Sequence, residues 1–123
     1  MDTAETDAPD SGPPDPPENL SARNGARLAH FIGMLSDDDE VSRWKAAEAL
    51  GRIGDPAAVD ELIGALWDDD ANVRMKAAWA LGQIGDRRAY TPLQRLYRME
   101  TERTKEIIEE ALEAIRRGMA GGE

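Results

Sequence analysis

Apolar residues in the middle of the chain recur three or four positions apart, which is the spacing of one face of an α-helix. One such stretch contains Ala58, Val59, Leu62, Ile63 and Leu66, and the next contains Val73, Ala77, Ala80, Leu81 and Ile84. Asp55 followed by Pro56 is typical of a helix start, and the aspartates at 68–70 supply an N-cap for the second stretch. Gly85 follows the last apolar position and favours a left-handed helix end. The pattern therefore predicts two helices joined by a short acidic turn.

The same pattern returns when the chain is shifted by 31 residues. The shift places SDDDEVSRWKAAEALGRIGD (36–55) on WDDDANVRMKAAWALGQIGD (67–86), with identical residues at most positions. It also places ARLAHFIGML (26–35) on AAVDELIGAL (57–66) and, more loosely, on RAYTPLQRLY (88–97). Ala80, Leu81 and Ile84 fall on Ala111, Leu112 and Ile115. A register kept along this length indicates three copies of a two-helix unit.

The repeat predicts six helices, near 24–35, 39–53, 56–67, 70–84, 87–98 and 101–117. A helix pair cannot cover its own apolar face, so the units must stack on one another. We therefore predict an all-α fold, a right-handed α-solenoid of three helix pairs over residues 24–118, with units at about 24–54, 55–85 and 86–117.

The two ends of the chain differ in composition from the repeats. Residues 1–23 are rich in proline and acidic residues and poor in apolar ones, which predicts a disordered tail. The tail is either a solubilising linker or an acidic peptide that docks on a partner or on its own domain. Residues 119–123 are predicted to be a flexible C-terminus.

The motif V-R-x-x-A-A-x-A-L-G-x-I-G-D, from Val73 to Asp86, follows an A-V-x-x-L-I-x-x-L segment. Together they resemble the HEAT-like repeat, and in particular the short 31-residue class named after phycobilin lyases. The resemblance covers residues 26–117. It implies a fold and no single function, because this repeat serves many unrelated roles.

The resemblance also implies a ladder of ion pairs between neighbouring units. In the family, an aspartate before the second helix and an arginine six residues later form this ladder. The matching positions here are Asp37 with Arg43 and Asp68 with Arg74. The third unit has Met99 and Lys105 at these positions, and its last helix carries Glu106, Glu109, Glu110 and Glu113. We interpret this polar helix as a capping unit that ends the solenoid.

The resemblance places the second helix of each pair on the concave face, where positions that differ between repeats are candidates for partner binding. They are Trp44, Glu48 and Arg52 in the first unit, Met75, Trp79 and Gln83 in the second, and Glu106 and Glu110 in the third. Their four-residue spacing places each set along one helix face, away from the core positions. Tryptophan is enriched at binding hot spots, so we predict a partly exposed, tryptophan-lined surface with an acidic end. Alternatively, Trp44 and Trp79 cover the neighbouring helix as peripheral core, with some stacking on Lys76 or Arg52.

Several single residues have a plainer structural interpretation. Trp67 ends a first-type helix beside the acidic turn, where we expect a half-buried packing residue. His30 aligns with Glu61 and is expected to face solvent. The aspartates at 37–39 and 68–70 could attract a hard cation, but their place at turns favours helix capping. Recurring glycines are expected to serve packing and caps; they are Gly51, Gly54, Gly82 and Gly85.

Composition narrows the class of partner. The net charge of −10 argues against nucleic acid and against anionic membranes, because both need clustered Lys and Arg. The chain has no cysteine, which excludes disulfides, thiolate metal sites and a cysteine nucleophile. No long apolar run or signal peptide is evident, so we expect a cytoplasmic protein.

The residues offer little for catalysis. The chain has one histidine, and His30 is followed by Phe31 rather than by the glutamate that iron-dependent hydroxylases built on similar repeats use. The sequence therefore predicts no enzyme, no metal and no cofactor. It predicts a monomeric interaction module or scaffold that binds a peptide or partner protein on its concave face. The alternatives are a bilin lyase or pigment-attachment chaperone, a regulatory subunit of a larger complex, and a solenoid that self-associates through its tryptophans.

Overall fold

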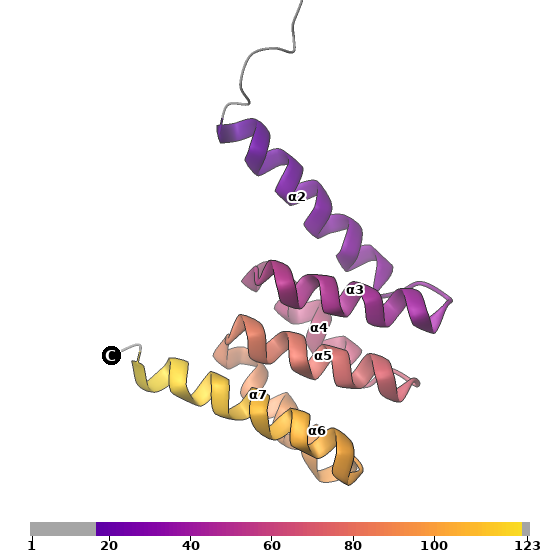
Figure 1. Ribbon diagram of the computed structural model, residues 1–123, viewed down its shortest axis with the longest axis vertical. Coiled ribbons are helices and arrows are strands. Elements are labelled where there is room, and N and C mark those ends of the chain that lie inside the picture. Colours follow the sequence, from indigo (N-terminus) through magenta and orange to yellow (C-terminus); the bar gives the residue numbers. More distant parts are fainter. Residues whose placement is uncertain (1–16, 122–123) are drawn as a thin grey trace, which may run out of the picture.

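The computed structural model describes residues 17–121 of the chain, as six α-helices and no strand (Figure 1). The helices are α2 (Pro17–Met34), α3 (Glu40–Ile53), α4 (Val59–Ala65), α5 (Ala71–Ile84), α6 (Tyr90–Met99) and α7 (Glu102–Gly121). Short 3-10 turns, η1 (Pro56–Ala58) and η2 (Arg87–Ala89), lead into α4 and α6. The predicted all-α solenoid of three helix pairs is confirmed.

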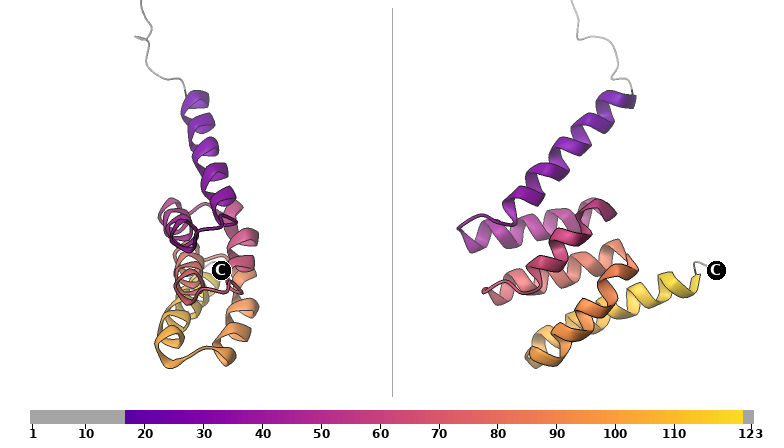
Figure 2. Two further views of the ribbon diagram at one scale, coloured as in Figure 1. Left: turned by 90° about the vertical axis from the view of Figure 1, so that its right-hand side faces the viewer. Right: turned by 180° about the vertical axis from the view of Figure 1, so that it is seen from behind.

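The helices form two layers, which separate clearly in the left view of Figure 2. One layer contains α3, α5 and α7, where α3 packs on α5 and α5 packs on α7. The other contains α2, α4 and α6, and each of these packs on the second helix of its own pair. Helix α2 extends beyond the stack of the other helices (Figures 1 and 2).

The core lies between the two layers and is built from both large and small residues. Its largest fully buried side chains include Leu50, Leu62, Leu66, Leu81, Leu93, Ile108 and Ile115. Alanines fill the contacts between the second helices, among them Ala46, Ala47, Ala77, Ala78, Ala80 and Ala111. Because alanine is small and a strong helix former, these positions allow the second helices to approach closely without weakening the helices themselves.

The helix ends follow the predicted capping pattern. Asp39 accepts a hydrogen bond from the Ser42 N–H, and Asp70 accepts one from the Val73 N–H, each at 3.1 Å. Gly54 and Gly85 end α3 and α5 with φ of 75° and 76°, a backbone region that favours glycine. The acidic turns therefore stabilise the starts of α3 and α5.

The first helix begins earlier than predicted. It starts at Pro17 rather than near residue 24, so residues 17–23 of the predicted tail are helical. Proline suits the first turn of a helix. Residues 1–16 of that tail lie outside the described residues. At the other end, α7 continues to Gly121, past the predicted end at residue 117.

Candidate functional site: the face formed by the second helices

An arginine from each of the first two units fixes the unit to the next one. The Arg43 guanidinium donates to both carboxylate oxygens of Asp68, from Nε at 2.8 Å and from Nη2 at 3.0 Å. Its Nη1 also donates to the carbonyl oxygens of Asp37 and Asp38, at 2.9 and 3.0 Å. The side chains of Arg43 and Asp68 are only 16% and 12% exposed. Arg43 therefore joins the turn before α3 to the turn before α5, and it contacts the carbonyl of Asp37 rather than its carboxylate.

The second such contact uses a residue that the repeat alignment missed. Arg74 Nε donates to Glu100 Oε2 at 2.6 Å, and Arg74 Nη1 donates to the carbonyls of Asp68 and Asp69. Glu100 is 7% exposed, whereas Met99, which aligns with Asp68, is 70% exposed. The third unit thus keeps the acidic partner one position later, on a side chain that is one methylene longer. An acid directly beside the aligned position was the signal that could have identified it.

The pKa of Asp68 reflects this environment. Burial on its own would raise the pKa of the carboxyl group, because it disfavours the charged form. Hydrogen bonds from Arg43 and from the Asp70 N–H outweigh burial and hold the pKa of Asp68 below its usual range. Asp68 is therefore a charged structural residue that aligns the second helices.

Two of the predicted tryptophans lie on the aligned second helices, on either side of one lysine. The Lys76 ammonium is 5.5 Å from the ring centroid of Trp44 and 6.0 Å from that of Trp79. Both rings are partly buried and pack against the core, and Trp79 lies over Gly51 of α3. Each ring therefore has a packed part and an exposed part, with Lys76 beside it as the peripheral-core alternative expected, and the binding of a partner by these rings stays a prediction.

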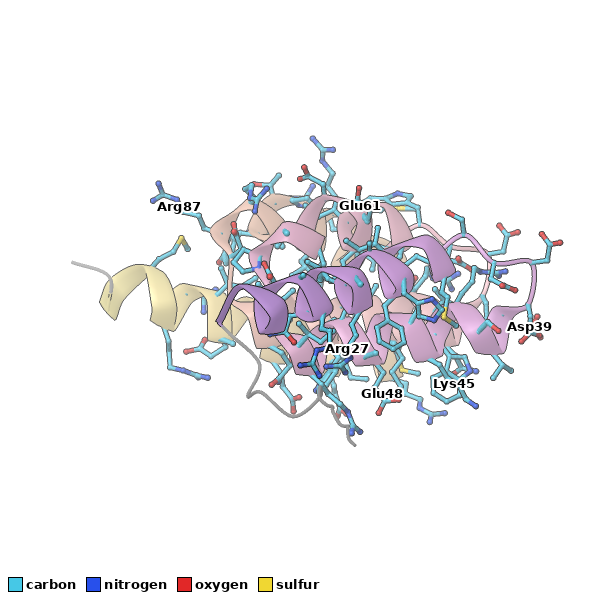
Figure 3. The ribbon with its side chains drawn as sticks, turned by 90° about the horizontal axis from the view of Figure 1, so that it is seen from above. Arg27, Asp39, Lys45, Glu48, Glu61 and Arg87 are labelled. Atoms are coloured by element: carbon cyan, nitrogen blue, oxygen red, sulfur yellow. The ribbon has the colours of Figure 1, made fainter. Side chains whose placement is uncertain are left out.

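The polar residues of this face are unevenly distributed. Glu48 binds Arg52 at 2.9 Å and lies 3.6 Å from Lys76, so one carboxylate serves two cations near α3. Gln83, Glu106 and Glu110 are exposed, and Met75 is partly buried. Figure 3 shows Glu48 and Lys45 projecting from one side of the molecule, and Glu61 and Arg87 from the opposite side. The face is thus slightly basic near α3, where two cations share Glu48, and acidic at Glu106 and Glu110 of α7.

A shallow groove between α5 and α7 completes this surface. It is lined by Trp79, Gly82, Gln83, Ile107, Glu110, Ala111 and Ala114. The sequence did not select Ile107 or Ala114, because the third unit diverges from the repeat there and offers no aligned tryptophan or methionine. We call the surface formed by Trp44, Met75, Trp79, Gln83, Glu106, Ile107 and Glu110 the second-helix face.

Two single-residue predictions have different outcomes. His30 is exposed and makes an edge contact with the Phe31 ring, as expected for a solvent-facing residue. Trp67 was expected to be a half-buried packing residue; at 46% exposed it is about half-buried, but it does not belong to the hydrophobic residues packed against the core. The short helix α4 ends at Ala65, so Trp67 lies in the turn beyond the helix rather than on its buried face.

Two further observations concern metal sites and membranes. Within residues 17–121, no group of three or more His, Asp or Glu side chains is arranged to hold a metal ion. Over the same part of the chain, no helix combines the length and the apolar character needed to cross a membrane.

A comparison with solved structures corrects one prediction. The structure of human deoxyhypusine hydroxylase in complex with glycerol superimposes with a TM-score of 0.69 and 21% identity. The match covers 88% of this chain and 41% of the hydroxylase chain, so this chain spans less than half of that protein. This likeness shows the fold alone. Because a protein of this fold is an enzyme, the prediction that the chain is not an enzyme is contradicted.

The family is shown by a second comparison. No curated protein matches the chain. A family model of HEAT repeats matches residues 28–113, which include most of the three helix pairs. Together with the capped helix pairs and the arginine contacts between units, this match identifies the chain as a member of the HEAT-repeat family.

Proposed function

We propose that the second-helix face binds a segment of a partner protein that carries basic residues beside apolar ones. The observation that supports this most directly is the position of Trp79. Its partly exposed ring has the Lys76 ammonium 6.0 Å from its centroid and lines the same groove as Ile107 and Glu110 of α7. An aromatic ring with one packed side and one open side is a typical anchor for a partner side chain.

The charges on α7 specify the chemistry of the partner. Glu106 and Glu110 are exposed and four residues apart, and neither carboxylate makes an ion pair to another described residue. By contrast, Lys76 and Arg52 have Glu48 beside them. The α7 end of the face therefore carries negative charge without an ion-pair partner, and it favours cationic groups on the bound segment. Apolar side chains of the partner would contact Trp79, Met75 and Ile107.

A selection from a random-peptide library tests this proposal and does not require the partner to be identified first. We expect the full chain to enrich peptides that combine Lys or Arg with an apolar or aromatic residue. The variant with Glu106→Lys and Glu110→Lys should bind these peptides at least about tenfold more weakly, because both sites become repulsive. Raising the salt concentration should weaken binding to the unmodified chain, since the interaction is partly electrostatic.

A matched control distinguishes a loss of affinity caused by changes on the second-helix face from one caused by the altered net charge of the chain. Asp60→Lys with Glu61→Lys makes the same charge change on the exposed side of α4, in the other layer. This control should retain the affinity of the unmodified chain. Failure to enrich any peptide, or equal loss of affinity in the two double variants, would overturn the proposal.

A further inference from the structure

An asparagine followed by a glycine lies in the first half of α2. The chain has three asparagines, and the residues that follow them differ: Leu20 follows Asn19, Gly25 follows Asn24, and Val73 follows Asn72. The backbone nitrogen after an asparagine can attack the carbon of the side-chain amide, and a side chain on that following residue hinders the attack. Glycine has no side chain, so the Asn24–Gly25 pair has the residues of a self-modifying site.

A continuous α-helix protects such a pair, because each backbone N–H donates to a carbonyl oxygen four residues earlier. The attack therefore requires that this turn of α2 opens. Residues 22–27 are all exposed, although Asn24 lines an open hollow with Asp55 and Pro56. A Cβ placed on Gly25 would meet no described atom within 4 Å. Asparagine and glycine are both poor helix formers, so this turn opens at low cost in free energy.

We propose that Asn24–Gly25 is a site of spontaneous deamidation, which takes place when the first half of α2 opens. The Gly25 nitrogen loses its proton and forms a bond to Cγ of Asn24, while the side-chain nitrogen leaves as ammonia. Water then opens the resulting cyclic succinimide at either of its two carbonyl groups. One opening gives aspartate at position 24. The other gives isoaspartate, in which the backbone runs through the former side chain.

The isoaspartate product has a consequence for the fold. It lengthens the backbone by a methylene group, so the hydrogen bonds of the helix cannot continue in register across position 24. The described α2 side chains that pack against the core all lie after this position, and they are Leu28, Phe31, Ile32 and Met34. We therefore expect the modified α2 to begin near residue 24, where the repeat alone predicts its start, and the three helix pairs to stay stacked.

Incubation of the full chain at neutral to mildly alkaline pH, followed by peptide mapping with mass spectrometry, tests the proposal. Aspartate and isoaspartate should form at position 24 at least about tenfold faster than at Asn19 or Asn72, because only Gly25 leaves the attacking nitrogen unhindered. Asn19 lies in the same half of α2, so it controls for opening of the helix. Gly25→Ala should slow the reaction at position 24 by at least about tenfold, since alanine hinders the attack and favours the helix.

Two further glycine substitutions test whether the opening is local. Ala22→Gly weakens the exposed first half of α2 and should speed the reaction by about threefold to fivefold. Gln94→Gly weakens α6, at the other end of the stack, and should leave the rate unchanged. Equal acceleration by both substitutions would show that the entire domain must unfold, which contradicts the proposed opening. A rate at position 24 no higher than at Asn19 or Asn72 would overturn the proposal.

The purified isoaspartate product tests the consequence for the fold. Backbone chemical shifts of residues 17–23 should lose their helical values, while those of α5 stay as in the unmodified chain. The purified aspartate product should keep helical shifts in both segments, because its backbone is unchanged. Helical shifts at residues 17–23 in the isoaspartate product would contradict the predicted new start of α2.

Discussion

Gly51 and Gly82 occupy equivalent positions in two repeats, and each lies against the next second helix. A Cβ added at Gly51 would lie 2.5 Å from Cζ3 of Trp79 and 2.9 Å from Cα of Ala80. A Cβ added at Gly82 would lie 2.8 Å from Cα of Ala111. Backbone atoms cannot move aside as the end of a flexible side chain can. These two glycines therefore set how closely the second helices approach.

We expect Gly51→Ala to lower the free energy of unfolding by about 1–3 kcal/mol, since the added methyl group overpacks the α3–α5 contact. The matched control is Gly64→Ala in α4, where an added Cβ meets nothing within 4 Å. That substitution should raise the free energy of unfolding by up to about 1 kcal/mol, because alanine is the better helix former. Urea denaturation of both variants measures the two effects. Equal stabilisation by the two alanines would contradict the close approach at Gly51.

Other residues show which structural features could be predicted from the sequence and which could not. Gly54 and Gly85 were predictable because a capping glycine needs only local backbone conformation, which the repeat makes visible. The exposure of Trp67 depends on the residue at which α4 ends. The sequence around Trp67 does not indicate that α4 already ends at Ala65. The partner of Arg74 was missed because Glu100 comes one position after the aligned Met99, and its longer side chain compensates for that shift.

At the scale of elements, the contacts between turns align the helices as much as the apolar core does. Arg43 binds the backbone of the turn before its own helix and the carboxylate of the turn before the next second helix. Arg74 repeats this arrangement with Glu100. Apolar contacts between parallel alanine-rich helices are non-directional, so they tolerate sliding along the axis. Directional hydrogen bonds at one end remove that freedom.

This arrangement predicts a specific dependence of stability on pH. The pKa of Asp68 is lower in the folded chain than in the unfolded chain, where an aspartate titrates near about 3.9. The contribution of its carboxylate to stability is thus complete above about pH 4 and is lost as the pH falls through the folded pKa. We expect Asp68→Asn to lower the free energy of unfolding at pH 7 by about 1–3 kcal/mol. The difference from the unmodified chain should shrink below about pH 4.

Denaturation at a series of pH values from 7 to 2.5 measures this difference. Glu113→Gln is the control, because the Glu113–Arg116 pair is exposed on both sides and should contribute less than about 1 kcal/mol. Asp86, whose pKa Arg88 also holds low, leaves some acid sensitivity in either variant. A difference between Asp68→Asn and the unmodified chain that stays constant down to pH 2.5 would show that the Asp68 charge contributes nothing.

The starts of α3 and α5 were predictable from their aspartate caps, whereas α4 and α6 begin three residues later than predicted, because Asp55 and Asp86 cap the 3-10 turns that precede them. Asp39 and Asp70 begin α3 and α5 within one residue of the predicted starts. The start of α2 was missed because residues 17–23 have few apolar residues to mark a buried face. A helix that extends beyond the stack needs no such face, so the periodicity that reveals the other helices is weak there.

At the scale of the whole molecule, the number of packed neighbours differs between helices. Helix α5 packs on α3, on α7 and on α4, and many of its residues are fully buried. Among the described helices, α2 packs extensively only on α3. Its residues 22–27 are all exposed. In a repeat protein, stability comes from each unit and from its contacts with neighbours, so a helix at the end of the stack loses fewer contacts when it opens.

We therefore expect amide hydrogen exchange to report a gradient along the solenoid. The amides of α5 should exchange most slowly, through opening of the entire domain, and those in the first half of α2 should exchange fastest. In low concentrations of urea, exchange in α5 should accelerate more steeply than exchange in α2, because complete unfolding exposes more surface than local opening does. Equal protection and equal urea dependence in α2 and α5 would instead indicate a single cooperative unit.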